Sequence, residues 1–210
     1  MTSRDTSGIA VVLAVKDLAH AKSRLTGTPG PRAKLVEAMV ADTLSAVRDA
    51  GIARVLVVTP DPVVTRMAGL HGATAHPDPG GGLNPALSAG ADAARRRWEV
   101  DRIAFLQADL PALTASSLVD AIEAAALHAD AFVADRSGVG TALLVSTTVT
   151  PAFGPDSAAA HRSAGADEID PAHLGFADLR CDVDTPDDLA AAQALGVGRC
   201  TATELQANGV

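Results

Sequence analysis

Short, uninterrupted apolar runs separated by helical patterns are the feature that most constrains the fold of this 210-residue chain. Residues 9–15, 54–59 and 102–107 are apolar almost throughout, without the alternation of a half-exposed strand. Strands of a parallel sheet read this way because helices cover both of their faces. The pattern therefore predicts an α/β fold, in which one mixed but mainly parallel sheet is flanked by helices.

The rest of the chain continues this alternation of strands and helices. Apolar residues at helical spacing predict helices over 31–50, 61–70, 85–98, 114–129 and 186–195. Further strands are expected at 72–76, 131–134, 141–146 and 178–183, and 150–175 reads as irregular. The length fits one domain over 9–198, between a flexible N-terminus (1–8) and a C-terminal tail (199–210). Ligands of such sheets bind beyond the carboxyl ends of the strands.

Charge and composition exclude several classes of partner. The formal net charge is −8, which argues against a nucleic-acid partner, because binding to the nucleic-acid backbone needs clustered Lys and Arg. Neither of the two cysteines has the spacing of a zinc site. No apolar stretch precedes Ile9, and the run over 9–15 is too short to span a bilayer. We expect a cytoplasmic protein without a membrane partner.

Two acidic motifs stand where buried strands are expected to end: LQADLP at 106–111 and CDVDTP at 181–186. They supply three carboxylates, Asp109, Asp182 and Asp184. In an extended chain Asp182 and Asp184 point to the same face, and like charges so close repel unless a cation lies between them. Mg²⁺ takes oxygen ligands from carboxylates and substrate phosphates. The motifs therefore predict a metal site in a nucleotide-processing enzyme.

Each acidic residue also has a structural alternative. Thr185 and Pro186 form a helix start, and Asp187 and Asp188 suit the first turn of that helix. Asp182 and Asp184 precede the cap, so capping does not explain them. Asp109 could be a turn residue before Pro111, but its place at the end of an apolar run favours a functional role.

A cationic segment follows the first expected strand. Lys16, Lys22 and Arg24, with the hydroxyl of Ser23, are the groups that a phosphate-binding loop needs. The alternative is a solvated basic loop. Neither a GxxxxGK[ST] nor a GxGxxG motif occurs, so the common phosphate-binding loops are not supported.

Three glycine-containing segments are candidates for ligand contacts. Gly82 and Asn84 open a helix, where a nucleoside contact and a simple turn are both open readings. The segments 134–141 and 153–157, the second followed by His161 and Arg162, are ordinary loops or the walls of an anion pocket.

Taken in order, these motifs resemble a known family. They are AVK (14–16), AKSRL (21–25), GLN (82–84), QADLP (107–111), GVGT (138–141), FGPDS (153–157) and CDVDTP (181–186). Over about residues 9–198 the chain resembles the phospholactate/phosphoenolpyruvate guanylyltransferases of coenzyme F-420 biosynthesis, in their actinobacterial form. The resemblance implies a nucleotidyltransferase fold of the GT-A, Rossmann-like type. It also implies GTP as substrate and Mg²⁺ as cofactor, with two ions when GTP is bound.

The resemblance also implies roles for individual residues. Asp109, Asp182 and Asp184 would hold the metal and, with Lys22, form the catalytic set. Phosphoenolpyruvate would be bound by Thr141, Gly154 and Ser157. The nucleotide would be bound by Lys16, Lys22, Ser23, Arg24, Gly82 and Asn84. One departure is that the segment 26–31 is short for the family.

The implied reaction transfers GMP from GTP to phosphoenolpyruvate and releases pyrophosphate, giving enolpyruvyl-diphospho-guanosine. Its unstable product could pass directly to the next enzyme of the pathway. 2-Phospho-L-lactate and 3-phosphoglycerate remain alternative acceptors, because one hydroxyl or methylene is worth only about 1–3 kcal/mol in an apolar pocket. A haloacid-dehalogenase-type phosphatase, suggested by Asp182–Thr185, and a non-enzymatic nucleotide-binding regulatory module are the rival functions. The oligomeric state stays open.

Overall fold

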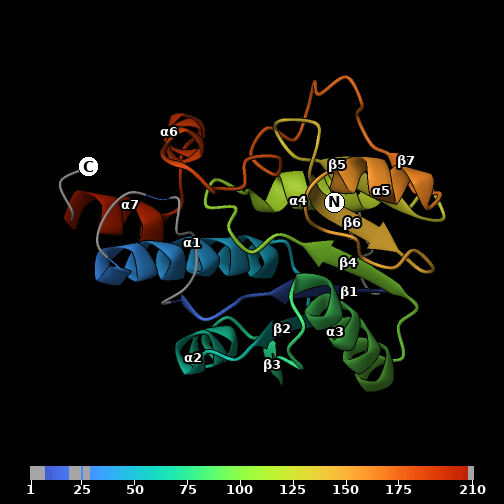
Figure 1. Cartoon of the computed structure of the whole chain (residues 1–210), viewed down its shortest axis with the longest axis horizontal. Helices are drawn as coiled ribbons and strands as arrows, with labels where there is room; N and C mark the ends of the chain where they lie inside the picture. The colour runs from blue at the N-terminus through green and yellow to red at the C-terminus, as the bar shows by residue number, and fades with distance from the viewer. Residues whose placement is uncertain (1–7, 19–24, 26–28, 208–210) are drawn as a thin grey trace.

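The computed structural model describes residues 8–18, 25 and 29–207, and it contains a seven-stranded sheet in the order β3-β2-β1-β4-β6-β5-β7 (Figure 1). The strands are β1 (Ile9–Ala14), β2 (Val55–Thr59), β3 (Thr74–Pro77), β4 (Arg102–Leu106), β5 (Ala131–Ala134), β6 (Thr141–Ser146) and β7 (Asp167–Glu168). β1 pairs in parallel with β2 and β4, whereas β6 runs antiparallel between β4 and β5. The predicted mixed, mainly parallel sheet is confirmed.

Helices cover both faces of this sheet, as the apolar strands require. They are α1 (Pro29–Asp49), α2 (Pro62–Leu70), α3 (Leu83–Trp98), α4 (Ala115–Ala125), α5 (Ser157–Ser163), α6 (Pro186–Leu195) and α7 (Arg199–Ala207). One apolar core lies on the face that α1 and α4 cover, and a second core lies under α3 and α5. Figure 1 shows β1 between α1 and α3. The first three predicted strands are buried for this reason.

The expected strand over 178–183 is wrong, and the topology supplies the reason. β4 already pairs with β1 and β6, and β5 pairs with β6 and β7, so neither strand has a free edge. Residues 181–183 do not join the sheet, and the N–H of Val183 donates to the carbonyl of Asp109, which follows the end of β4. The segment 150–175 is more regular than expected, because it contains α5 and β7.

Residues 199–207, expected to belong to a C-terminal tail, form α7 packed along α1. The buried carboxylate of Asp42 on α1 accepts hydrogen bonds from the backbone N–H groups of Cys200 (3.0 Å) and Thr201 (2.8 Å). A carboxylate at the first turn of a helix satisfies N–H groups that have no partner within the helix. The domain boundaries themselves stay a prediction. Within the described part of the chain, no helix combines the length and the apolar composition needed to cross a membrane.

Two helical glycines give a matched test of how closely α3 packs on the sheet. A Cβ atom at Gly90 would lie 2.6 Å from Cγ1 of Val12 and 2.7 Å from Cγ2 of Val58, whereas one at Gly69 on α2 would meet nothing within 4 Å. We expect Gly90→Ala to lower the free energy of unfolding by about 1–3 kcal/mol through overpacking. Gly69→Ala should raise it by about 0.5–1 kcal/mol, because alanine favours the helix. Urea unfolding measures both, and equal effects would contradict the close packing of α3.

Candidate active site

A pocket of about 580 Å³ lies at the edge of the sheet where β1 and β4 end and β6 begins. Lys16 stands two residues after β1, Asp109 follows β4, and Thr141 is the first residue of β6. Seven of the predicted site residues line this pocket: Lys16, Asp109, Thr141, Gly154, Ser157, Asp182 and Asp184. Residues far apart in the sequence therefore meet at the carboxyl ends of the strands, as the fold class predicts.

The two acidic motifs are in direct contact. The backbone N–H of Val183, between Asp182 and Asp184, donates to the carbonyl oxygen of Asp109 at 3.1 Å. Asp109 is buried, Asp182 is half-buried and Asp184 is exposed, so the carboxylates range from the sheet to solvent. Both motifs were expected at the ends of buried strands. Residues 181–183 form no strand, and the backbone hydrogen bond from Val183 to Asp109 links the two motifs.

The position of Asp109 is fixed from below by α1. The N–H of the next residue, Leu110, donates to the hydroxyl oxygen of Thr43 at 3.0 Å, and that hydroxyl donates to the carbonyl of Met39. Thr43 is fully buried, so a helix of the core holds the backbone beside the carboxylate.

The donor set of the pocket fits a hard divalent cation that also binds substrate. Asp109, Asp182 and Asp184 offer carboxylate oxygens, the ligands such cations prefer. Over the described residues, no three His, Cys, Asp or Glu side chains stand close enough to hold a metal by themselves. Mg²⁺ usually keeps several waters and takes substrate phosphates as ligands, so it does not need an all-protein cage.

The pocket is strongly acidic for a site that would bind phosphates. Five carboxylates and one lysine are found among its described lining residues: Asp109, Asp135, Asp156, Asp182, Asp184 and Lys16. Lys22, Ser23 and Arg24, predicted to face the nucleotide phosphates, lie outside the described residues, and their roles stay a prediction.

Asp187 and Asp188 lie in the first turn of α6, as the helix-start pattern predicted. Thr185 caps α6, and Asp188 at its third position completes a capping box, while Asp187 lies in the same first turn. Asp188 also pairs with Arg136 at 2.5 Å. Asp182 and Asp184 line the pocket, and the N–H of Asp184 donates to the Asp188 carboxylate at 3.3 Å.

Asn84 holds the loop that carries Gly154. Its Nδ2 donates to the carbonyl of Phe153 at 2.9 Å, and its Oδ1 accepts from the Phe153 N–H at 2.8 Å. Leu83 lines the pocket, while Gly82 and Asn84 are absent from its wall. The Asn84 amide therefore positions this loop. The predicted contact of Gly82 and Asn84 with the nucleoside stays a prediction.

The Gly154 loop needs glycine at its turn. The φ angle of Gly154 is +137°, which side-chain-bearing residues rarely adopt, and no atom lies within 4 Å of a Cβ built there. Ser157 follows as the buried first residue of α5, and its N–H donates to the carbonyl of Gly154 at 3.2 Å.

His161 on α5 lies behind Thr141 and is completely buried. Its Nδ1 is 2.9 Å from the hydroxyl oxygen of Thr141, and its Nε2 accepts from the backbone N–H of Ala152 at 2.9 Å. The ring packs edge-on against Phe153, with centroids 5.3 Å apart. Burial lowers the pKa of His161 to about 4, so the imidazole is neutral at physiological pH.

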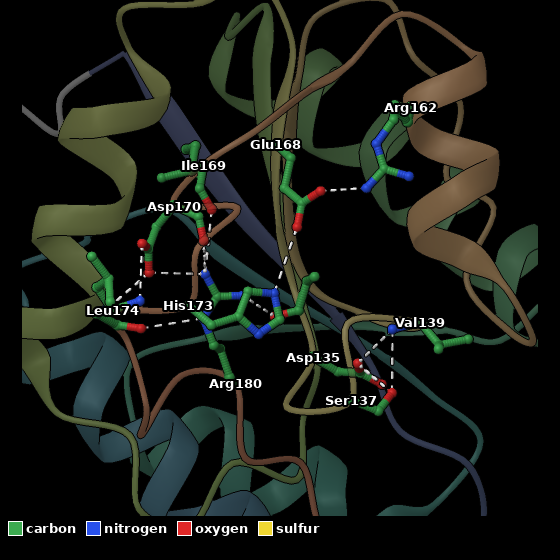
Figure 2. A network of polar contacts seen from close by, with 12 residues as sticks. Asp135, Ser137, Val139, Arg162, Glu168, Ile169, Asp170, His173, Leu174 and Arg180 are labelled. Atoms are coloured by element: carbon green, nitrogen blue, oxygen red, sulfur yellow. Dashed lines mark hydrogen bonds and ion pairs between the residues drawn. The ribbon is translucent and has the colours of Figure 1, made fainter.

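Arg180 organises the wall of the pocket on the side of β5, and the sequence analysis did not identify it (Figure 2). Its Nη1 donates to the carbonyl of Ala134 at 2.8 Å, and its Nη2 donates to the carbonyl of Asp170 at 2.9 Å and to the carboxylate of Asp170 at 3.1 Å. Its Nε donates to the carbonyl of Gly175 at 3.2 Å. The signal in the sequence is one cation in the otherwise apolar stretch LRC.

The loop between β5 and β6 completes this wall, and it too was only broadly indicated by the sequence. The Asp135 carboxylate accepts from the Ser137 hydroxyl at 2.8 Å and from the Val139 N–H at 3.1 Å (Figure 2). A Cβ on Gly140 would lie 2.3 Å from Oδ2 of Asp135. The glycine therefore lets the Asp135 side chain fold under the loop.

The fold and site define the class of protein. The model of the MobA-like NTP transferase domain matches residues 24–172. A nucleotidyl transferase from a Methanothermobacter species has a similar fold, with a TM-score of 0.59, 18% identity, and coverage of 89% of this chain and 97% of that one. A Mycobacterium tuberculosis H37Rv protein solved as a complex with manganese has a TM-score of 0.52, 20% identity, and coverage of 88% and 96%. The chain is a nucleotidyltransferase.

Curated relatives narrow this class. The phosphoenolpyruvate guanylyltransferase of Thermomonospora curvata is 47% identical over 199 residues, which cover 92% of this chain and 86% of that protein. The phosphoenolpyruvate guanylyltransferase of Mycobacterium leprae strain TN is 43% identical and covers 93% of both. The chain belongs to the phosphoenolpyruvate guanylyltransferase family, as its motifs predicted.

Replacing Arg180 tests its structural role. We expect Arg180→Met to lower the free energy of unfolding by about 3–5 kcal/mol, because the carbonyls and the Asp170 carboxylate lose a buried cation. Arg66→Met, at an exposed position of α2, is the matched control and should leave stability nearly unchanged. Urea unfolding followed by circular dichroism measures both. Equal stability of the two variants would show that Arg180 does not hold this wall.

The buried His161 predicts a pH dependence of stability. The unfolded chain takes up a proton near pH 6.5 and the folded protein only near pH 4, so stability falls as the pH drops through this window. Between pH 7.5 and 5 the wild type should lose about 2 kcal/mol more than His161→Phe. The pKa of His71 is also lowered, by burial first, but His71 is present in both proteins and cancels. Equal losses in urea unfolding at the two pH values would contradict a neutral buried His161.

Proposed function

We propose that this chain transfers GMP from GTP to phosphoenolpyruvate with release of pyrophosphate, giving enolpyruvyl-diphospho-guanosine for coenzyme F-420 biosynthesis. One observation carries the proposal. The chain is 43–47% identical to phosphoenolpyruvate guanylyltransferases over more than 90% of its length. In its structure the acidic motifs, Lys16, Thr141 and the Gly154 loop line one pocket.

The acceptor side of the pocket is formed by Thr141, Gly154 and Ser157. In the proposal these residues bind phosphoenolpyruvate through hydroxyl and backbone N–H groups. Such groups donate to phosphate and carboxylate oxygens without adding charge. Their shared origin at the start of β6 and the loop before α5 supports a single small ligand at this wall.

The nucleotide side is assigned to the segment after β1. Lys16 lines the pocket, and we propose that Lys22, Ser23 and Arg24 complete a phosphate-binding loop, with Lys22 contributing to catalysis. Gly82 and Asn84 would lie near the nucleoside. Asn84 would contact the nucleoside from its position beside the Phe153 peptide. Its two hydrogen bonds to that peptide also position the Gly154 loop.

We propose that Asp109, Asp182 and Asp184 hold Mg²⁺, with two ions when GTP is bound. The oxygen donor set of the pocket supports a divalent metal, and a structural neighbour was solved as a complex with manganese. When bound, such a cation neutralises charge on the phosphates and on the leaving pyrophosphate. The excess of carboxylates over lysine in the described lining makes that neutralisation necessary for a polyanionic substrate.

The residues of the chain then act by orientation. An oxygen of the acceptor phosphate attacks the α-phosphorus of GTP, a new P–O bond forms, and the bond to the bridging oxygen of pyrophosphate breaks. A phosphate dianion is already nucleophilic, so no side chain has to remove a proton. Lys16 offsets the repulsion between the two polyanions, and the acceptor wall keeps the attacking oxygen in line.

The rivals are decided by different observations. A haloacid-dehalogenase-type phosphatase is excluded because the chain belongs to a nucleotidyltransferase family. The regulatory module is the weaker reading, since the relatives are named as enzymes. 2-Phospho-L-lactate and 3-phosphoglycerate are the alternative acceptors, and the names of the relatives favour phosphoenolpyruvate.

A triphosphate does not cross membranes, so we place the reaction in the cytoplasm. We also propose that the unstable product passes directly to the enzyme that consumes it.

Pyrophosphate release from GTP and Mg²⁺ with each of the three acids tests the function, with the nucleotide product checked by mass spectrometry. We expect release with phosphoenolpyruvate and a loss of roughly 100- to 1,000-fold in Asp109→Asn and Asp182→Asn, because each removes a charge that binds the metal. Asp187→Asn is the matched control, since Asp187 is exposed and outside the pocket.

The wild-type result decides among the readings. Release with another of the acids, and not with phosphoenolpyruvate, would correct the substrate. No release with any acid, while GTP still binds, would overturn the enzyme assignment. Full activity in Asp109→Asn would contradict the proposed metal site.

A further inference from the structure

The hydrogen bonds around His161 determine which of its nitrogens carries the proton. Nε2 lies 2.9 Å from the backbone nitrogen of Ala152, which can only donate, so Nε2 must accept and carries no hydrogen. A neutral imidazole has one N–H, and it must then be on Nδ1. That N–H points to the hydroxyl oxygen of Thr141, 2.9 Å away.

This arrangement fixes the direction of the Thr141 hydroxyl. The oxygen accepts from His161, so its own hydrogen is available for a second partner. The hydroxyl makes this one hydrogen bond within the described part of the chain, and Thr141 lines the pocket. Phosphate and carboxylate oxygens accept hydrogen bonds and do not donate them when ionised. The polarity of the hydroxyl therefore matches an anionic ligand.

We propose that His161 is a positioning residue that, through its Nδ1–H, makes the Thr141 hydroxyl a hydrogen-bond donor toward an anionic oxygen of the acceptor. The inference rests on the proposed function and deepens it, because it names the residue that sets the polarity of the acceptor wall. His161 itself does not touch the substrate: it is fully buried, and both of its nitrogens are engaged.

The surroundings of His161 keep this arrangement in place. The ring packs between Phe132 and Phe153, with centroid separations of 6.1 and 5.3 Å. The Ala152 N–H comes from the chain just before the Phe153 peptide that Asn84 holds from both sides. Neighbouring Arg162 points away to Glu168 and lies over the ring of Phe132, so it offers the imidazole no hydrogen bond. The imidazole is thus held in one orientation by α5, β6 and the loop between them.

The first test uses the unmodified protein. Nitrogen-15 NMR of the histidine side chains distinguishes the two neutral tautomers, and we expect His161 to carry its hydrogen on Nδ1 between pH 6 and 8. His161→Phe identifies the signal by its loss. A hydrogen on Nε2, or a doubly protonated ring in this range, would overturn the inference without any reference to activity.

The second test is a double-mutant cycle on the steady-state kinetics. Thr141→Val keeps the shape and removes the hydroxyl, and we expect a rise in KM for phosphoenolpyruvate of roughly tenfold or more, because a hydrogen bond to a charged group is lost. His161→Phe should raise the same KM, and the double variant should be no worse than Thr141→Val alone. KM for GTP and kcat should change little, since the bond is made equally in the ground state and the transition state.

Control variants separate positioning from loss of structure. Thr141→Ser keeps the hydroxyl and should keep most of the affinity for phosphoenolpyruvate. His71→Phe replaces a histidine that lies outside the pocket and should leave KM unchanged. Additive effects in the double variant, or equal losses in kcat and in both KM values for His161→Phe, would overturn the inference. If the wild type turns over phosphoenolpyruvate while His161 carries its hydrogen on Nε2, this inference alone is overturned. If no acid is turned over, the proposed function and this inference are overturned together.

Discussion

The wall of the pocket on the side of β5 depends on one buried cation. Arg180 donates to backbone carbonyls of Ala134, Ile169, Asp170 and Gly175, which come from three separate parts of the chain. A guanidinium presents its donors in a rigid fork, so these carbonyls are fixed relative to one another as well as satisfied. The carbonyl of Arg180 accepts from the Arg136 N–H, and three residues later Val183 binds the backbone of Asp109. The path that carries Asp182 and Asp184 over the sheet is thereby held at both ends.

The reversal of β6 explains why Thr141 and the carboxylates of the two acidic motifs share one pocket. Because β6 is antiparallel to β4, its first residue, Thr141, lies at the same edge of the sheet as the carboxyl end of β4. A further parallel strand in this position would present its carboxyl end there instead. β6 on one side and β1 on the other leave β4 without a free edge, so the segment 178–183 does not pair with it. Asp182 of this segment lines the pocket instead.

The sequence was sufficient where a pattern is local and insufficient where the cause is distant. Unbroken apolar runs predicted β1, β2 and β4, and the Thr185–Pro186 start predicted α6, because burial and capping act within a few residues. The apolar residues before Asp182 led to the wrong prediction of a strand over 178–183. Apolar residues indicate burial, but the pairing of the other strands decides whether a buried segment joins the sheet. The roles of Arg180, Asn84 and His161 depend on backbone groups 5 to 69 positions away along the chain, which no spacing reveals.

The two sides of the pocket solve the problem of binding anions in different ways. The wall proposed to bind the acceptor contributes hydroxyls and a glycine loop, together with the carboxylates of Asp135 and Asp156. Burial keeps His161, behind Thr141, neutral. The opposite side has Lys16 and the three aspartates of the acidic motifs, so its charge is balanced only when cations join it. A hydroxyl that a neutral histidine holds in one direction binds a small anion through the geometry of its hydrogen bond, which depends little on ionic strength.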